Sequence, residues 1–331
     1  MEQQIFSIKS KINTVIHHPS IIKSILLYRK KLNEIRSEID EIDKDKSMKL
    51  VSHLKETFPY AIDSSQRPKL NRLCSLEDWN NDEVRQTLSE IHKLNPFGLI
   101  HRKDWEWAIG IIAMKRFNKL NQNNIAIGIG SGTEPIPFYL ANKLKHVYAT
   151  DLYGEIENWN NASPSDFHDN PKKYAPFPYK ADALTVLRMN GTRLEFPSET
   201  FDIAFSFSSI EHFVGKNHSG ALKAMKEIGR VLKKDGIAVI ATEYIINDKK
   251  HPEFFNKSTI FSDLINKLDS LKLVEPLDLR ITTKTLDTAM DIEIDANWNS
   301  VDDHFKRNHP LILLRNRSIL YTSIMLIFKK Y

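Results

Sequence analysis

The sequence has little of what marks secreted and membrane proteins. Cys74 is the only cysteine in 331 residues, so no disulfide can form within the chain. No apolar run approaches the ~18 residues of a membrane-spanning helix, and the N-terminus lacks an apolar core followed by a small-residue cleavage site. There is no internal repeat and no low-complexity tract. We therefore expect a cytoplasmic protein without a transmembrane segment.

The composition is that of an ordinary globular protein. Hydrophobic residues make up 41% of the chain and charged residues 27%, which argues against disorder. A chain of this length can hold one large α/β domain and an additional region. The formal net charge of +5 is modest, and the basic residues do not form a recognisable binding module. A nucleic-acid partner is therefore not expected.

A glycine-rich segment lies in the middle of the chain. The apolar run that starts at Ile125 leads into three alternate glycines, Gly128, Gly130 and Gly132. Glycines allow a sharp turn and a close backbone approach to a ligand, and the N–H groups of a following helix can point at that ligand. The spacing G-x-G-x-G differs from the dinucleotide fingerprint G-x-G-x-x-G, which disfavours an NAD-linked oxidoreductase.

The segments after this loop read as alternating strands and helices. Asp151 ends the next apolar run, and an acid at this place in an open α/β sheet can accept hydrogen bonds from ribose hydroxyls. A helix pattern closes on residues 233–236, and residues 261–268 form a second amphipathic helix. The last strand is expected to be antiparallel, at or near the sheet edge. The predicted strands cover residues 125–129, 146–150, 185–189, 203–207, 237–244, 279–283 and 318–328.

With these segments the sequence resembles the class I S-adenosylmethionine-dependent methyltransferases, close to the type 11/12 methyltransferase-domain group. The resemblance is close over residues 99–245 and looser beyond them. It implies an α/β fold with a Rossmann-like seven-stranded sheet and helices on both faces, S-adenosylmethionine as cofactor and S-adenosylhomocysteine as product. Five motifs carry it: the glycine loop, Asp151, and residues 194–202, 209–213 and 227–236.

The resemblance also implies a cofactor site. Relatives carry an acid where Gly128 stands, and that acid helps to hold the cofactor's ammonium group. Glu134 is expected to take over this contact, or else to cap a helix whose dipole stabilises it. Asn190 replaces the aspartate that meets the adenine amino group, and its amide oxygen can accept the same hydrogen bond, although Asn190 and Gly191 can also form a plain turn. The expected cofactor site comprises Arg102, Gly128, Gly130, Ser131, Gly132, Glu134, Asp151, Leu152, Asn190, Gly191 and Ser206.

Three residues begin the helix before the first of these strands. Arg102 either pairs with the methionine carboxylate through a charge-assisted hydrogen bond or is a solvated surface residue. His101 either lines the same pocket or is exposed at the helix start. Trp105 shares an apolar face with Ile109 and Ile112, and is expected in the core.

Methyl transfer requires that the acceptor nucleophile is aligned with the S–CH3 bond. A hydroxyl acceptor also needs a positioned base. His212, just after the predicted strand at residues 203–207, is the predicted base. Glu243, at the end of the predicted strand at residues 237–244, is the second candidate. Glu211 is expected to make a structural hydrogen bond, and the alternative for His212 is a residue that only packs the loop. The acids and histidine of residues 166–169 match no metal-ligand motif, so no metal is expected.

The first part of the chain differs from the rest. Apolar residues between positions 25 and 42 recur at steps of three and four. This stripe predicts either a long helix packed on the catalytic domain or a coiled coil that forms a homodimer. We therefore divide the chain into a helical region, 1–98, and a methyltransferase domain, 99–331. An insertion at 153–183, rich in aromatic residues and prolines, is expected to form a lid or acceptor-binding wall, or to pack on the sheet edge.

Three functions stay open at this point. Residues 105–107, 149–154 and 209–213 resemble those of bacterial enzymes associated with polysaccharide and cell-surface glycan assembly, which implies a sugar or glycan hydroxyl as acceptor. A second possibility is methyl transfer to a small metabolite or to RNA. The third is a cofactor-binding scaffold without catalysis, suggested by the altered glycine loop and the helical N-terminal region.

Overall fold

The computed structural model describes residues 30, 69–94, 100–154, 164–213, 215–288, 310–316 and 318–331. The chain divides into two compact units, residues 1–52 and 53–331. In the first unit only Lys30 is described, as an exposed helical residue. The rest of the apolar stripe at residues 25–42 lies outside the described residues, so a coiled coil or homodimer made by it stays a prediction.

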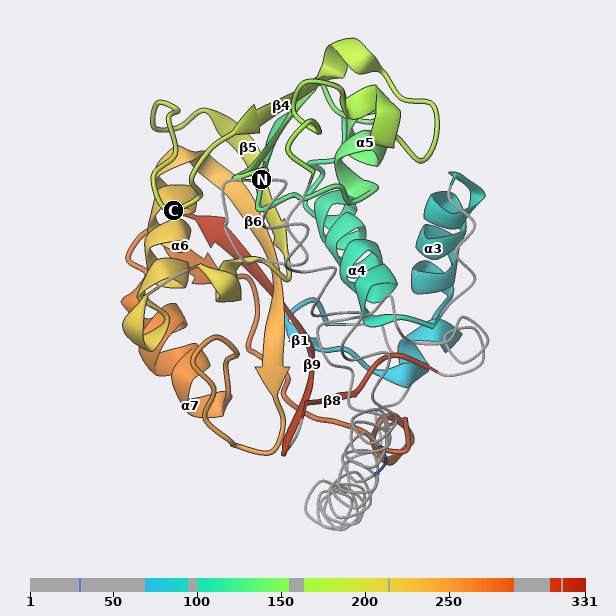
Figure 1. The fold of residues 1–331 in the computed structure, drawn as a ribbon, viewed down its shortest axis with the longest axis vertical. Coiled ribbons are helices and arrows are strands. Elements are labelled where there is room, and N and C mark those ends of the chain that lie inside the picture. The colour runs from blue at the N-terminus through green and yellow to red at the C-terminus, as the bar shows by residue number, and fades with distance from the viewer. Residues whose placement is uncertain are drawn as a thin grey trace, which may run out of the picture. The chain divides into compact units, whose positions relative to one another are not determined.

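The second unit is built on one mixed sheet (Figure 1), with the strand order β1-β9-β6-β5-β2-β3-β4 and with β7 and β8 also paired to β9. Its central strands are almost continuous apolar runs, as expected for parallel strands that are covered on both faces. These five parallel strands are β2 (Ile125–Ile129), β3 (His146–Asp151), β4 (Leu184–Arg188), β5 (Phe201–Phe207) and β6 (Leu232–Ile245). All five correspond to predicted strands.

The far edge of the sheet is organised by one long strand, β9 (Ile319–Lys330). It runs antiparallel to β6, which confirms the orientation predicted for the last strand. Three short strands follow one another along the other side of β9: β8 (Leu314–Asn316), β1 (Arg72–Leu73) and β7 (Leu271–Leu273). Within the described residues the sheet therefore has nine strands, not the expected seven, because three short segments occupy the place of one edge strand.

Two boundaries differ from the sequence-based expectation. Residues 279–283 do not form a strand. Instead, Thr282 caps the short helix α8 (Thr283–Leu286) by accepting a hydrogen bond from the Thr285 backbone N–H at 3.1 Å. The helix before β6 ends at Val231, and residues 233–236 belong to an irregular start of β6, where Asp235 has a φ of 64°.

Helices cover both faces of the sheet, as predicted (Figure 1). On one face lie α4 (Arg102–Arg116) and α5 (Ile136–Ala141), with α3 (Asp82–Leu94) packed on α4. On the other lie α6 (Ser219–Val231) and the helical run that begins with α7 (Lys257–Thr259). None of the described helices is long and apolar enough to cross a membrane.

The described part of the insertion, residues 164–183, packs against the domain. Phe167 is fully buried, with its ring centroid 6.2 Å from that of Phe138 on α5 and 5.3 Å from that of Tyr153. Phe177 also belongs to the core. These contacts favour the packed alternative for this part, whereas residues 155–163 lie outside the described residues and a lid formed by them stays a prediction.

Candidate active site

A cavity of about 640 Å³ lies at the carboxyl ends of the parallel strands. Its wall is made by the loops after β2, β3, β4 and β5, by the end of β6 and by the start of α4. This is the edge at which open α/β sheets bind their ligands. The predicted site residues in the wall are Arg102, Gly130, Ser131, Gly132, Glu134, Asp151, Leu152, Asn190, Gly191, His212 and Glu243.

Gly128 and Ser206 are not among the described residues that line this cavity. Both belong to buried strands. A Cβ atom at Gly128 would lie 2.2 Å from Ser131 Oγ and 2.5 Å from Phe205 Cζ. The Ser131 hydroxyl and the Phe205 ring therefore leave no room for the acidic side chain that the resemblance implies at this place.

The glycine loop is held against β3 by backbone hydrogen bonds and by Asp151. Gly130 has a φ of 62°, in the left-handed region that favours glycine. Asp151 accepts hydrogen bonds from the N–H groups of Gly132 at 2.8 Å and Leu152 at 2.7 Å. Burial raises the pKa of Asp151, and these N–H groups oppose the shift. A carboxylate has further lone pairs, so Asp151 can hold the loop and still accept from a ribose hydroxyl.

Asn190 forms a local turn. Its Oδ1 accepts hydrogen bonds from the backbone N–H of Thr192 at 2.9 Å and from Thr192 Oγ1 at 2.8 Å. A Cβ atom at Gly191 would lie 2.6 Å from both Ile129 Cγ2 and Phe213 Cε2, so this position has room only for glycine. The plain turn foreseen for these residues is present, and it places them in the cavity wall.

Arg102 is buried, so of the two alternatives left open for it the solvated surface arginine is wrong. Its guanidinium donates to Glu106 at 3.0 Å, to Glu243 at 2.5 Å and to the hydroxyls of Ser208 and Ser323 at 3.1 and 3.0 Å. Burial alone would lower the pKa of Arg102, but Glu243 and Glu106 raise it above its usual value. The side chain thus ties α4 to β6 and β9 beneath the cavity.

Glu134 is bound by α4 and not by the start of its own helix. Its carboxylate accepts from Lys103 Nζ at 2.8 Å and from Trp107 Nε1 at 3.2 Å. Burial raises the pKa of Glu134, and Lys103 opposes this shift. The helix α5 begins after Pro135, which makes no side-chain cap. Glu134 therefore does not act as the helix cap considered from the sequence.

The other residues at the start of α4 have structural roles. His101 caps the helix, because its Nδ1 accepts from the Lys103 N–H at 3.0 Å, and burial together with Arg102 and Lys103 lowers its pKa to about 3. Trp105 is in the core, as predicted, and its Nε1 donates to Asp78 at 2.6 Å. Neither His101 nor Trp105 belongs to the described residues that line the cavity.

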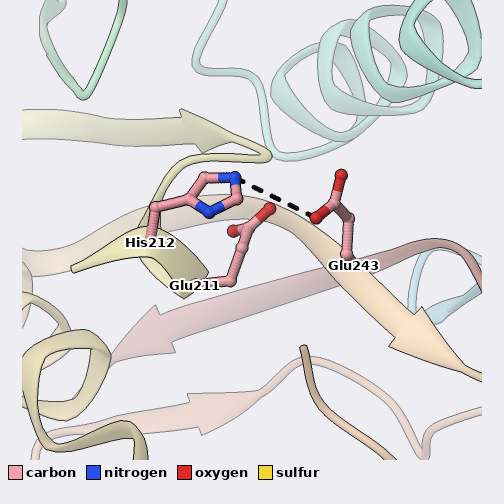
Figure 2. A group of neighbouring side chains, drawn as sticks. All are labelled: Glu211, His212 and Glu243. Atoms are coloured by element: carbon pink, nitrogen blue, oxygen red, sulfur yellow. Dashed lines mark ion pairs between the residues drawn. The ribbon is translucent and has the colours of Figure 1, made fainter. Parts of the chain in front are cut away.

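His212 lies between carboxylates. It ends the short 3₁₀ helix η4 (Ile210–His212), and its ring converges with the side chains of Glu211 and Glu243 (Figure 2). Its Nδ1 is 2.8 Å from Glu253 Oε2, and its Nε2 is 4.0 Å from Glu243 Oε2. Burial alone would lower the pKa of His212, but the bond to Glu253 and the charges of Glu211 and Glu243 raise it to about 9.

Glu211 makes the structural hydrogen bond expected of it. Its Oε2 accepts from Thr242 Oγ1 at 3.0 Å, within the buried interior. Burial, followed by the neighbouring charge of Glu243, raises the pKa of Glu211. Two carboxylates in one buried place resist ionising together, which makes this corner of the site strongly attractive to a proton or another cation.

The sequence did not reveal Lys103 and Glu253 as parts of the site. The position of Lys103 beside Arg102, at the start of a predicted helix, is the feature of the sequence that could have indicated its place in the site. Glu253 comes from a loop that returns to β6, where the Phe255 N–H donates to the Glu243 carbonyl at 3.1 Å and the Ile245 N–H to the Phe255 carbonyl at 2.7 Å. No local pattern in the sequence predicts that this loop pairs with β6.

The comparisons with known proteins agree with this geometry. The family model described as a methyltransferase domain matches residues 127–240. Residues 127–240 therefore contain a methyltransferase domain. The protein is a methyltransferase that uses S-adenosylmethionine as its methyl donor. No curated protein matches the sequence.

Solved structures with a similar fold have low sequence identity. A TehB-like S-adenosylmethionine-dependent methyltransferase from Corynebacterium glutamicum is 15% identical, over 67% of this chain and 85% of that one, with a TM-score of 0.38. Geranyl diphosphate C-methyltransferase from Streptomyces coelicolor, bound to Mg²⁺, geranyl diphosphate and S-adenosylhomocysteine, is 11% identical. That match covers 68% of this chain and 77% of the other, with a TM-score of 0.45.

The buried Arg102 network yields a stability prediction. Glu106→Gln keeps the shape of the side chain but removes a charge that faces Arg102. We expect the free energy of unfolding, measured by urea denaturation, to fall by about 3–5 kcal/mol, the usual cost of breaking a buried ion pair. The control is Glu83→Gln, which breaks a partly exposed pair with Arg116 and should cost less than about 1 kcal/mol. Equal losses in the two variants would contradict the importance of the network.

Proposed function

We propose that this methyltransferase transfers the methyl group to a hydroxyl of a sugar or glycan, with His212 as the base. The observation that supports this is the place of His212: it lines the same cavity as the glycine loop and Asp151. The proposed proton acceptor and the proposed nucleoside-binding edge thus share one cavity, as direct displacement requires.

The cofactor is proposed to follow the wall of this cavity. Asp151 accepts from the ribose hydroxyls, and Leu152 and the turn at Asn190 lie beside the adenine. At the other end, Glu134 faces the ammonium group, while Arg102 provides positive charge for the carboxylate. The partly exposed ion pair between Glu134 and Lys103 supports this arrangement, because it holds opposite charges next to the glycine loop.

The chemistry is one displacement. The acceptor oxygen forms a bond to the methyl carbon while the S–CH3 bond breaks, the proton passes to His212 Nε2, and S-adenosylhomocysteine leaves. Glu253 holds Nδ1 and thereby directs the other ring nitrogen toward Glu243 and the cavity. These carboxylates favour the protonated ring, and a positive charge on a bound methyl donor would oppose them and favour the neutral His212, which is the form that accepts a proton.

The aromatic lining supports a sugar-like acceptor. Phe213 contributes a partly exposed ring to the cavity wall beside the polar groups, whereas Tyr153 and Phe207 also line the wall but are only 1% and 4% exposed. Aromatic rings provide flat apolar surfaces on which the C–H faces of a sugar can pack, while the hydroxyls bond to polar side chains. A small metabolite, an RNA or a scaffold without catalysis are the alternatives, and activity assays on glycan fractions separate them from this proposal.

The first prediction from this proposal concerns the cofactor. Asp151→Ala removes the proposed ribose acceptor, and a lost hydrogen bond to a charged group costs about 1.5–3 kcal/mol. Binding of S-adenosylhomocysteine, measured by calorimetry, should therefore weaken roughly 10- to 100-fold. Asp169→Ala, at an exposed position of the insertion, is the control and should bind normally. Tight binding of NAD without any affinity for S-adenosylhomocysteine would contradict the cofactor site.

The second prediction concerns the base. His212→Ala should leave the affinity for S-adenosylhomocysteine nearly unchanged but reduce methyl transfer to a hydroxyl acceptor by roughly 10²- to 10⁴-fold. Radiolabelled methyl transfer to glycan fractions measures the rate. Glu243→Gln is the comparison, and a larger loss there would reverse the two roles. Full activity in both variants would show that alignment alone drives the transfer.

A further inference from the structure

We propose that Glu211, His212 and Glu243 bind a divalent metal ion beside the cofactor cavity. Each of the three offers one ligand atom, and these atoms lie within 4.8 Å of one another. Metal–ligand bonds of ~2.0–2.2 Å place neighbouring ligand atoms ~3–4 Å apart, so small side-chain rotations are sufficient to close the site. The three side chains converge in Figure 2.

Two buried carboxylate oxygens point to an ion at this place. Glu211 and Glu243 are only 3% and 5% exposed. In the part of the chain that the structure describes, Glu211 Oε1 and Glu243 Oε2 are buried without a hydrogen-bond partner. A buried charged oxygen without a hydrogen bond is costly. Glu243 Oε2 faces His212 Nε2 at 4.0 Å, beyond hydrogen-bond distance, and a metal ion bound between this nitrogen and the two carboxylate oxygens would satisfy all three atoms.

Each proposed ligand is also held by a second residue through its other polar atom. Thr242 donates to Glu211 Oε2 at 3.0 Å, and Arg102 donates to Glu243 Oε1 at 2.5 Å. Glu253 holds His212 Nδ1 at 2.8 Å. Metal ligands are typically oriented in this way, with a carboxylate on the non-ligating nitrogen of the histidine.

The donor set indicates the kind of ion. One imidazole nitrogen and two carboxylate oxygens suit a first-row divalent ion such as Zn²⁺ or Mn²⁺ better than Ca²⁺, which takes oxygen ligands. Metal binding does not depend on which acceptor the enzyme methylates. The effect of the ion on activity does rest on the proposed function: an ion on His212 occupies the nitrogen that would accept the proton, so the metal-loaded enzyme is inhibited.

The experiment uses the full chain, stripped of metal with a chelator, and Mn²⁺ alone as probe. Electron paramagnetic resonance of free Mn²⁺ should show one bound ion per chain that Zn²⁺ displaces. Glu211→Gln and His212→Gln should each weaken binding by at least about 10-fold. Asp263→Asn is the matched control, because Asp263 pairs with His218 in a similar carboxylate–histidine contact outside the cluster, and binding should be unchanged.

Binding of S-adenosylhomocysteine shows that each variant is folded. Neither Mn²⁺ nor Zn²⁺ binding to the folded protein, or equal binding by Glu211→Gln and His212→Gln, would overturn the metal site. Inhibition of methyl transfer by Mn²⁺ would support both proposals. Stimulation would keep the metal site and contradict His212 as the base, whereas metal binding without any transfer to glycans would contradict the proposed function alone.

Discussion

The structure depends on one buried cation. The Arg102 guanidinium donates hydrogen bonds to Glu106 within α4, to Glu243 on β6 and to the hydroxyls of Ser208 and Ser323. A charge in this position requires partners from each of these segments, because an unpaired charge in the interior is very costly. The same contacts fix the cavity wall, since Arg102, Ser208 and Glu243 all line it. The constraint that holds the fold together therefore also positions the site.

The central sheet could be predicted from the sequence, but the edge could not. Each parallel strand is a buried apolar run, and the local composition is sufficient to predict it. The strands β1, β7 and β8 have only two or three residues each and exist because the long strand β9 offers its free edge. Segments this short carry no periodicity, so the sequence predicts a strand at residues 279–283 instead, where the structure has none.

The site shows the same division. The loop glycines and Asp151 lie together in the cavity wall, because their motifs fix the backbone locally. The pairing of Glu134 with Lys103 and of His212 with Glu253 depends on how distant segments pack, and no local pattern encodes it. Gly128 illustrates the difference. From the sequence, the absence of an acid at this position indicates a change in cofactor binding, whereas in the structure the Phe205 ring leaves no room for a larger side chain there.

The central claim is that the cavity at the carboxyl ends of the parallel strands holds the methyl donor. The most direct measurement is a crystal structure of the full chain grown with S-adenosylhomocysteine. We expect the ribose hydroxyls to lie within hydrogen-bond distance of the Asp151 carboxylate, with the homocysteine part between the glycine loop and the start of α4. A nucleoside bound away from Asp151, or an empty cavity at saturating ligand, would contradict it.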